Sequence, residues 1–169
     1  MADKMIIKQA ATEKEIQAVR RLFREYEVFL DVDLGFQNFD AESAGLPGKY
    51  ARPDGDLLIG MDGNRILGCV AVRRLEDSVC EMKRLYVRPE ARGTGLGRRL
   101  AQEIIVVARE LGYSLMRLDT LDRLTNAIRL YEILGFRRTA PYYENPLHGV
   151  VYWELNLDRL EGPSDSGTS

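Results

Sequence analysis

A glycine-rich turn at residues 92–97 has the residue types and spacing to bind an anion. It reads Arg-Gly-Thr-Gly-Leu-Gly, and it follows an apolar run and opens an amphipathic stretch. Backbone N–H groups in a turn that opens a helix can hold a phosphate, and the helix dipole favours the negative charge. The arginines near the turn in sequence are Arg84, Arg88, Arg92, Arg98 and Arg99. Together these features predict a phosphate-bearing ligand.

The spacing of the glycines excludes two common nucleotide-binding motifs. A dinucleotide-binding fingerprint needs G-x-G-x-x-G, and counting from Gly93 and Gly95 its third glycine would fall at Arg98. A Walker A loop needs G-x-x-x-x-G-K-[ST], which this segment does not match. A nucleotide-binding oxidoreductase is therefore disfavoured.

The elements that must position this turn follow from hydrophobic periodicity. A strand is expected over 79–88, and Pro89 ends it because proline cannot donate a ladder hydrogen bond. A helix is expected over 95–111, followed by a strand over 114–120. Because a helix connects them, these two strands should be parallel neighbours in a right-handed crossover.

The rest of the chain adds strands and helices around this unit. A capping box at Thr12 and Glu15 predicts the start of a helix. The other expected strands cover 5–10, 57–61, 66–74, 136–143 and 150–157, and the other expected helices cover 13–30, 125–134 and a short piece near 40–46. We predict one α/β (α+β) domain over residues 1–158, with a mixed, mostly antiparallel central sheet of about seven strands, a parallel pair at its centre and about four helices. Residues 159–169 are expected to be a flexible tail.

Composition narrows the possible partners. A net charge of −2 argues against a general nucleic-acid binder. No run approaches the roughly 20 apolar residues that cross a membrane, and no signal peptide is evident, so we expect a cytoplasmic protein. Cys69 and Cys80 should not face each other in their hairpin, which predicts free thiols. The single histidine, His148, makes a multi-histidine metal site unexpected, and we predict no metal.

Two motifs give the sequence a family resemblance. Arg92, Gly95 and Gly97 match the Q/R-x-x-G-x-G/A signature with which the GNAT N-acetyltransferase superfamily binds acetyl-CoA. Downstream, Asn126, Tyr131 and the Gly-Phe pair at 135–136 fit the pattern N-A-x-x-x-Y-x-x-x-G-F of the same superfamily. The expected element order resembles that family along residues 1–157. The resemblance implies an acetyl-CoA-dependent N-acetyltransferase.

The resemblance also implies roles for individual residues. Acetyl-CoA would lie between the strand carrying residues 85–87 and the strand carrying residues 118–120. Tyr131 would protonate the departing thiolate, and Glu81 would be the general base, with His148 as a rival. The residues implied for cofactor binding are Leu85, Tyr86, Val87, Arg92, Gly93, Thr94, Gly95, Leu96, Gly97, Arg98 and Asn126. A backbone N–H near Tyr86 or Val87 would stabilise the oxyanion.

The acceptor is expected to be a small-molecule primary amine. Carboxylates and aromatic rings suit a cationic amine, and the expected acceptor-binding residues are Asp31, Phe36, Tyr142 and Asn145. Two alternatives stay open, namely acetylation of a protein or peptide amino group, and a non-catalytic acyl-CoA-binding regulatory module. A homodimer is also possible by analogy, through the last strand as an exposed edge.

Overall fold

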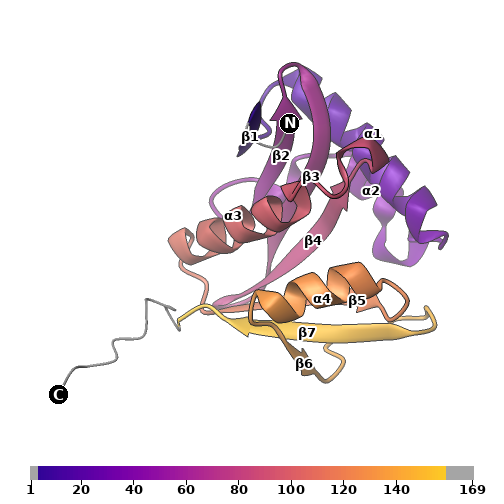
Figure 1. Cartoon of the computed structure of the whole chain (residues 1–169). Coiled ribbons are helices and arrows are strands. Elements are labelled where there is room, and N and C mark those ends of the chain that lie inside the picture. The colour runs from indigo at the N-terminus through magenta and orange to yellow at the C-terminus, as the bar shows by residue number, and fades with distance from the viewer. Residues whose placement is uncertain (1–3, 159–169) are drawn as a thin grey trace.

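Strand pairing in the computed structural model, which describes residues 4–158, gives one mixed sheet in the order β1-β2-β3-β4-β5-β7-β6 (Figure 1). The strands are β1 (Met5–Gln9), β2 (Asp56–Asp62), β3 (Arg65–Glu76), β4 (Val79–Val87), β5 (Leu115–Leu121), β6 (Arg137–Thr139) and β7 (Val150–Asn156). Only β4 and β5 are parallel, and every other neighbouring pair is antiparallel. The predicted fold class and its central parallel pair are therefore confirmed.

Helices cover both faces of this sheet. The α-helices are α1 (Glu13–Leu30), α2 (Phe39–Ala44), α3 (Leu96–Glu110) and α4 (Thr125–Ile133), and short 3-10 turns occur at Gly35–Gln37, Gly48–Tyr50 and Pro89–Ala91. The predicted capping box starts α1, because the Glu15 N–H donates to Thr12 Oγ1 and the Thr12 N–H donates to Glu15 Oε1. Within residues 4–158, every helix is too short or too polar to cross a lipid bilayer.

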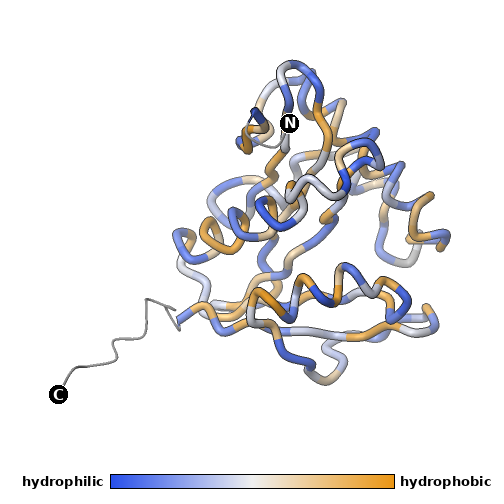
Figure 2. The backbone as a smooth tube through the Cα atoms, viewed as in Figure 1, coloured by the Kyte–Doolittle hydropathy of each residue, from blue (hydrophilic) through white to orange (hydrophobic). Residues whose placement is uncertain are grey.

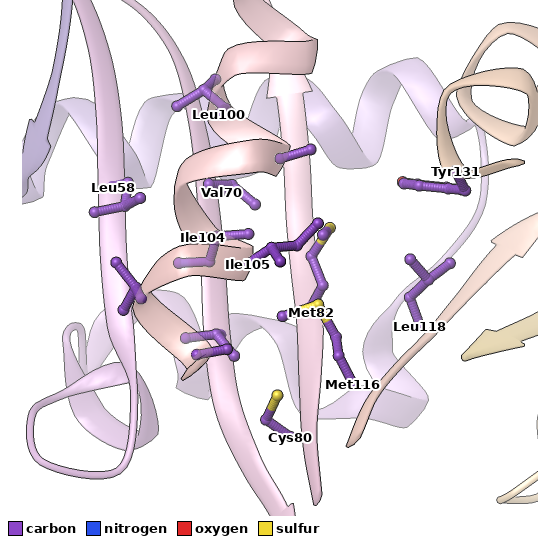
Figure 3. Close-up of a cluster of buried hydrophobic side chains, with 14 of the residues drawn as sticks. Leu58, Val70, Cys80, Met82, Leu100, Ile104, Ile105, Met116, Leu118 and Tyr131 are labelled. Atoms are coloured by element: carbon purple, nitrogen blue, oxygen red, sulfur yellow. The ribbon is translucent and has the colours of Figure 1, made fainter. Parts of the chain in front are cut away.

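Two buried clusters hold the layers together. On one face, apolar residues of α3 and α4 pack on β4 and β5, as Figure 3 shows for Ile104, Met82 and Met116. On the other face, Phe23 of α1 and Phe39 of α2 pack with β2 and β3. Figure 2 shows the corresponding alternation of apolar and polar residues along α3. The sheet is thus buried on both sides near its centre.

Two expectations about the last strands were wrong. The strand predicted over 136–143 pairs only at Arg137–Thr139, because Pro141 cannot donate to the ladder and the two tyrosines after it bond to side chains of the site instead. The last strand, β7, is not the sheet edge that we expected, since it lies between β5 and β6. The tail predicted over 159–169 lies outside the described residues.

Both cysteines are free, as predicted, and both are buried. In the hairpin of β3 and β4, Cys80 lies opposite Arg74, and Cys69 lies opposite Tyr86. Burial raises the pKa of each thiol to about 12, so neither is a reactive thiolate at neutral pH.

A bulge in β4 breaks the regular pairing of the sheet. Between Cys69 and Ala71 the β3 strand advances two residues, whereas β4 advances three, from Tyr86 to Lys83. Arg84, inside this bulge, has a left-handed φ of 60°, which is rare for a residue with a side chain. As a result Lys83 and Arg84, although consecutive, both point to the face covered by α1 and α2.

Beyond the start of β4 the two parallel strands separate. Residues 79–81 pair with 115–117, and the ladder ends there. The strands then diverge, as is visible between β4 and β5 in Figure 1. A cavity of about 330 Å³ occupies the resulting gap, with Met82–Leu85 on one side and Leu118–Leu121 on the other.

Two glycines seat the start of α3 against the sheet. A Cβ at Gly60 of β2 would lie 2.6 Å from Leu96 Cδ1, and a Cβ at Gly68 of β3 would lie 3.0 Å from Leu100 Cδ1. Leu96 is the first residue of α3 and is fully buried. The glycines therefore set the height at which the helix, and the glycine turn before it, lie above the sheet.

We expect Gly60→Ala to lower the free energy of unfolding by about 1–3 kcal/mol, because the added methyl group overlaps Leu96 in a close-packed core. Urea denaturation measures this change. In a Leu96→Ala background the same substitution should cost much less, because the overlapping atoms are gone. Equal costs in both backgrounds would contradict the proposed contact.

Candidate active site

The glycine turn opens the helix α3 with its backbone exposed. Gly93 and Gly95 have left-handed φ values of 79° and 85°, and open space surrounds the position of a Cβ at each. Gly95 is the N-cap of α3 and has no side chain with which to cap the helix. The Thr94 hydroxyl donates to the Ala91 carbonyl and accepts a 3.4 Å hydrogen bond from the Leu96 N–H, the first of the helix. The next N–H groups, of Gly97 and Arg98, have no partner within residues 4–158 and are available to an anion.

The arginines near the turn divide into two groups. Arg84 and Arg88 are committed to internal ion pairs, with Glu42 at 2.9 Å and Glu25 at 2.8 Å respectively. Arg92 and Arg98 are exposed, and the Arg92 guanidinium stacks 4.7 Å from the centre of the Phe29 ring of α1. These two are the better placed to meet phosphate groups.

The cavity between β4 and β5, called here the donor cavity, contains both residues of the second motif. Asn126 and Tyr131 of α4 line it. Tyr131 is buried and packs edge-on against Phe136, and Figure 3 shows its ring near Leu118 of β5. Its hydroxyl has no hydrogen-bond partner within residues 4–158, and burial raises its pKa well above the usual value. The hydroxyl is therefore protonated and uncommitted.

A second cavity of about 250 Å³, called here the acceptor cavity, lies on the face covered by α2. Its lining residues are Gln37, Glu42, Lys49, Arg73, Leu75, Glu81, Lys83, Arg84, Tyr143 and Glu144. Three of these, Gln37, Lys83 and Arg84, also line the donor cavity. The two cavities therefore meet at the bulge of β4, with Tyr131 on one side of the junction and Glu81 on the other.

Glu81 is a buried carboxylate with a tightly defined environment. It is 1% exposed, its Oε1 lies 2.9 Å from Arg73 Nε, and its Oε2 accepts a 2.6 Å hydrogen bond from the Tyr142 hydroxyl. Burial raises its pKa, but Lys83, Arg73 and the Tyr142 hydroxyl outweigh burial and hold the pKa below the ordinary value. Glu81 is therefore ionised at neutral pH.

A second carboxylate cluster, around Asp119 of β5, was missed by the sequence analysis. The Tyr143 hydroxyl donates to Asp119 Oδ2 at 2.8 Å, and Asn145 Nδ2 donates to the Tyr143 hydroxyl at 2.7 Å. Lys83 Nζ lies 3.9 Å from Asp119 Oδ1 and 3.9 Å from Glu81 Oε1. Nothing in the sequence signals this cluster except the proximity of Asp119 to the expected strand end.

The residues predicted to bind the acceptor are only partly brought together. Tyr142 and Asn145 join the two carboxylate clusters through the hydrogen bonds above. Asp31 is instead the exposed C-cap of α1 and lines neither cavity, and the side chain of Phe36 lies outside the described part of the structure. His148, the rival base, is exposed and lines neither cavity.

Comparison with known proteins identifies the family. The family model described as "Acetyltransferase (GNAT) family" matches residues 16–136. The chain belongs to the GNAT acetyltransferase family. It is 47% identical to an uncharacterized N-acetyltransferase of Schizosaccharomyces pombe over 86% of this chain and 91% of that protein. It is 30% identical to an uncharacterized N-acetyltransferase of Dictyostelium discoideum over 90% of this chain and all of that protein.

Solved structures agree with this GNAT assignment at the level of the fold. The protein yncA of Salmonella typhimurium, solved with its cofactor acetyl-CoA, has a TM-score of 0.73 at 21% identity over 95% of this chain and 98% of that one. An acetyltransferase from Streptococcus agalactiae has a TM-score of 0.76 at 21% identity over 90% and 98%. As a GNAT member with N-acetyltransferase relatives, the protein is an acetyl-CoA-dependent acyltransferase.

We expect Arg73→Met to raise the pKa of Glu81, because it removes one of the cations that stabilise the carboxylate. A carbon-13 NMR titration of the glutamate carboxyl groups measures the change. Arg74→Met is the matched control, since Arg74 is exposed and pairs with Asp77 instead. Unchanged titration of Glu81 in Arg73→Met would show that the ion pair does not set its pKa.

Proposed function

We propose that this protein transfers the acetyl group of acetyl-CoA to a small-molecule primary amine, by direct attack within a ternary complex. The observation that carries the proposal is the meeting of two cavities at the β4 bulge. One cavity contains Asn126 and Tyr131 of the family motif, and the other contains the buried carboxylate of Glu81. A donor and an acceptor can therefore occupy separate spaces and react at the junction.

The donor would be held by backbone groups along its length. The backbone of residues 92–97, with Gly93 and Gly95 in left-handed conformations, would bind the pyrophosphate. Because β4 leaves β5 after residue 81, the backbone of Leu85 and Val87 is free of a partner strand on that side and can pair with the pantetheine arm. Asn126, exposed at the rim of the donor cavity, would bond the same arm.

The acceptor amine must lose a proton before it attacks. An alkylammonium has a pKa of about 10.4, so the amine arrives protonated. Glu81 would accept this proton, directly or through a water, as the free amine forms. Because the pKa of Glu81 is held low, its protonated form is short-lived. Glu81 would therefore release the proton quickly to solvent and return to the carboxylate.

Attack then forms the carbon–nitrogen bond and places a negative charge on the thioester oxygen. The N–H of Tyr86 or Val87 would stabilise this oxyanion. Collapse of the intermediate breaks the carbon–sulfur bond, and Tyr131 would protonate the departing thiolate and recover a proton from the nitrogen through solvent. Burial raises the pKa of Tyr131, but the same apolar surroundings also disfavour the thiolate, so proton transfer between them remains feasible.

The volume of the acceptor cavity favours a small molecule over a polypeptide acceptor. At about 250 Å³ it can enclose a compact amine, whereas a peptide would need an open groove. A panel of small amines and short peptides, assayed for release of free CoA, tests this choice. We expect turnover with small amines only. Turnover with peptides alone would establish a protein acceptor. If neither amines nor peptides cause release of CoA, an acyl-CoA-binding regulatory module is favoured.

We expect Tyr131→Phe to lower kcat at least tenfold, because the thiolate loses its proton donor. Acetyl-CoA affinity should be nearly unchanged, so acetyl-CoA at 100 times its Kd should add about 2.7 kcal/mol of stability to both proteins in thermal-shift measurements. Tyr113→Phe is the control, because the Tyr113 hydroxyl bonds the Asp54 carbonyl away from both cavities. Unchanged turnover in Tyr131→Phe would remove this residue from the mechanism.

A further inference from the structure

The charged groups at the junction of the two cavities are already paired with one another. Glu81 pairs with Arg73 at 2.9 Å, and Glu42 pairs with Arg84 at 2.9 Å. Asp119 accepts a hydrogen bond from Tyr143 and has Lys83 as its nearby cation. Within residues 4–158, each of these three carboxylates thus has an internal donor, and Lys49 at the cavity mouth adds a fourth cation, 3.7 Å from Glu42.

This balance is unfavourable for an acceptor that carries only positive charge. A cation that enters a buried site whose carboxylates are already paired loses hydration that nothing replaces. Other acidic residues near the site are exposed. Asp40 is exposed and pairs with Arg24, and Asp33 is exposed and accepts from the Gly35 N–H. Glu144 is an exposed carboxylate at the rim of the acceptor cavity.

Hydrogen-bond donors, in contrast, are in excess at the junction. The Lys83 ammonium has three N–H donors, and within residues 4–158 it makes one hydrogen bond, to Gln37 Oε1 at 3.2 Å. Its distances of 3.9 Å to Glu81 and Asp119 are too long for hydrogen bonds. Arg84 Nη2 is buried and has no hydrogen-bond partner among the described residues. Buried donors normally have acceptors, so the junction is short of acceptor oxygens.

We infer that the acceptor is an amino acid or a close analogue, whose carboxylate is bound by Lys83 at the junction while its amino group faces Glu81. The inference rests on the proposed function and names the substrate class of the same site. A carboxylate supplies the missing acceptor oxygens, and its charge offsets that of the substrate ammonium. Such a zwitterion enters the site without changing the net charge. Gln37, which bonds both Lys83 and the Tyr143 hydroxyl, orients the Lys83 ammonium for this role.

Matched acceptor pairs test the inference in the wild-type protein. Each of the common amino acids is compared with the amine formed by its decarboxylation, such as phenylalanine with phenethylamine and leucine with isoamylamine. We expect the best amino acid to exceed its decarboxylated partner at least tenfold in kcat/KM. If the decarboxylated amines are acetylated as well as or better than the amino acids, the inference fails and the proposed function stands. If no member of either set is acetylated, both fail.

Variants of Lys83 assign the effect to this side chain. Lys83→Met should lower kcat/KM for the best amino acid at least tenfold more than for its decarboxylated partner, so the preference disappears. The loss of this cation beside Glu81 affects both acceptors alike. Lys83→Arg, which keeps the charge, should retain part of the preference. Lys49→Met is the matched control, because Lys49 lines the same cavity but is largely exposed. An unchanged acetyl-CoA thermal shift verifies that each variant is folded.

Two kinetic results would overturn the assignment to Lys83. An equal fall in kcat/KM for amino acids and amines in Lys83→Met would mean that Lys83 acts only on a group that every acceptor shares, such as Glu81 or the thioester oxygen. Retention of the full amino-acid preference in Lys83→Met would mean that another group binds the carboxylate.

Discussion

The left-handed backbone at Arg84 is the constraint on which the site depends. A residue with a side chain in this conformation costs about 1–2 kcal/mol, so it persists only where its surroundings enforce it. Here Glu42 holds the guanidinium at 2.9 Å, and Phe39 stacks 5.0 Å from it. The bulge that results shifts the register of β4 against β3 and turns Lys83 and Arg84 to one face. Strand separation, the donor cavity and the junction with the acceptor cavity all occur at this point.

Ion pairs fix the geometry of the acceptor cavity in the same way. Its ion pairs join different elements of the fold: Glu42 of α2 to β4, Arg73 of β3 to β4, and Lys83 of β4 to β5. Such pairs contribute little net stability, because desolvation offsets much of the attraction. Their effect is on geometry, since each one restricts where a carboxylate or an ammonium can lie. The acceptor cavity is therefore shaped before a substrate arrives.

Sequence patterns predicted the fold well wherever the information is local. The Thr12 capping box started α1 where expected, and the crossover from β4 to β5 gave the parallel pair. The motif residues Asn126 and Tyr131 do line one cavity. The length of β6 was not predictable, because Tyr142 and Tyr143 have the propensity of strand residues and leave the sheet only to bond carboxylates from other strands.

The site itself was less predictable, because its key contacts are long-range. Arg84 was predicted to lie near the phosphates because it is close to the turn in sequence. Its ion pair with Glu42 of α2 is long-range and is not visible in the sequence. Asp119 and Lys83 lie on different strands, and Gln37 lies in the loop after α1, so their meeting depends on the register of the bulge. Asp31 was predicted to bind the acceptor because it is acidic, but it is the C-cap of α1 instead.

Hydrogen bonds between this loop and β4 couple the sequences of the two segments. Segment 31–55 is attached to the bulge through Gln37 and Glu42. A substitution at Gln37 or Glu42 would therefore also remove a contact of Lys83 or Arg84. The loop and the strand form one unit, in which a change on one side calls for a matching change on the other.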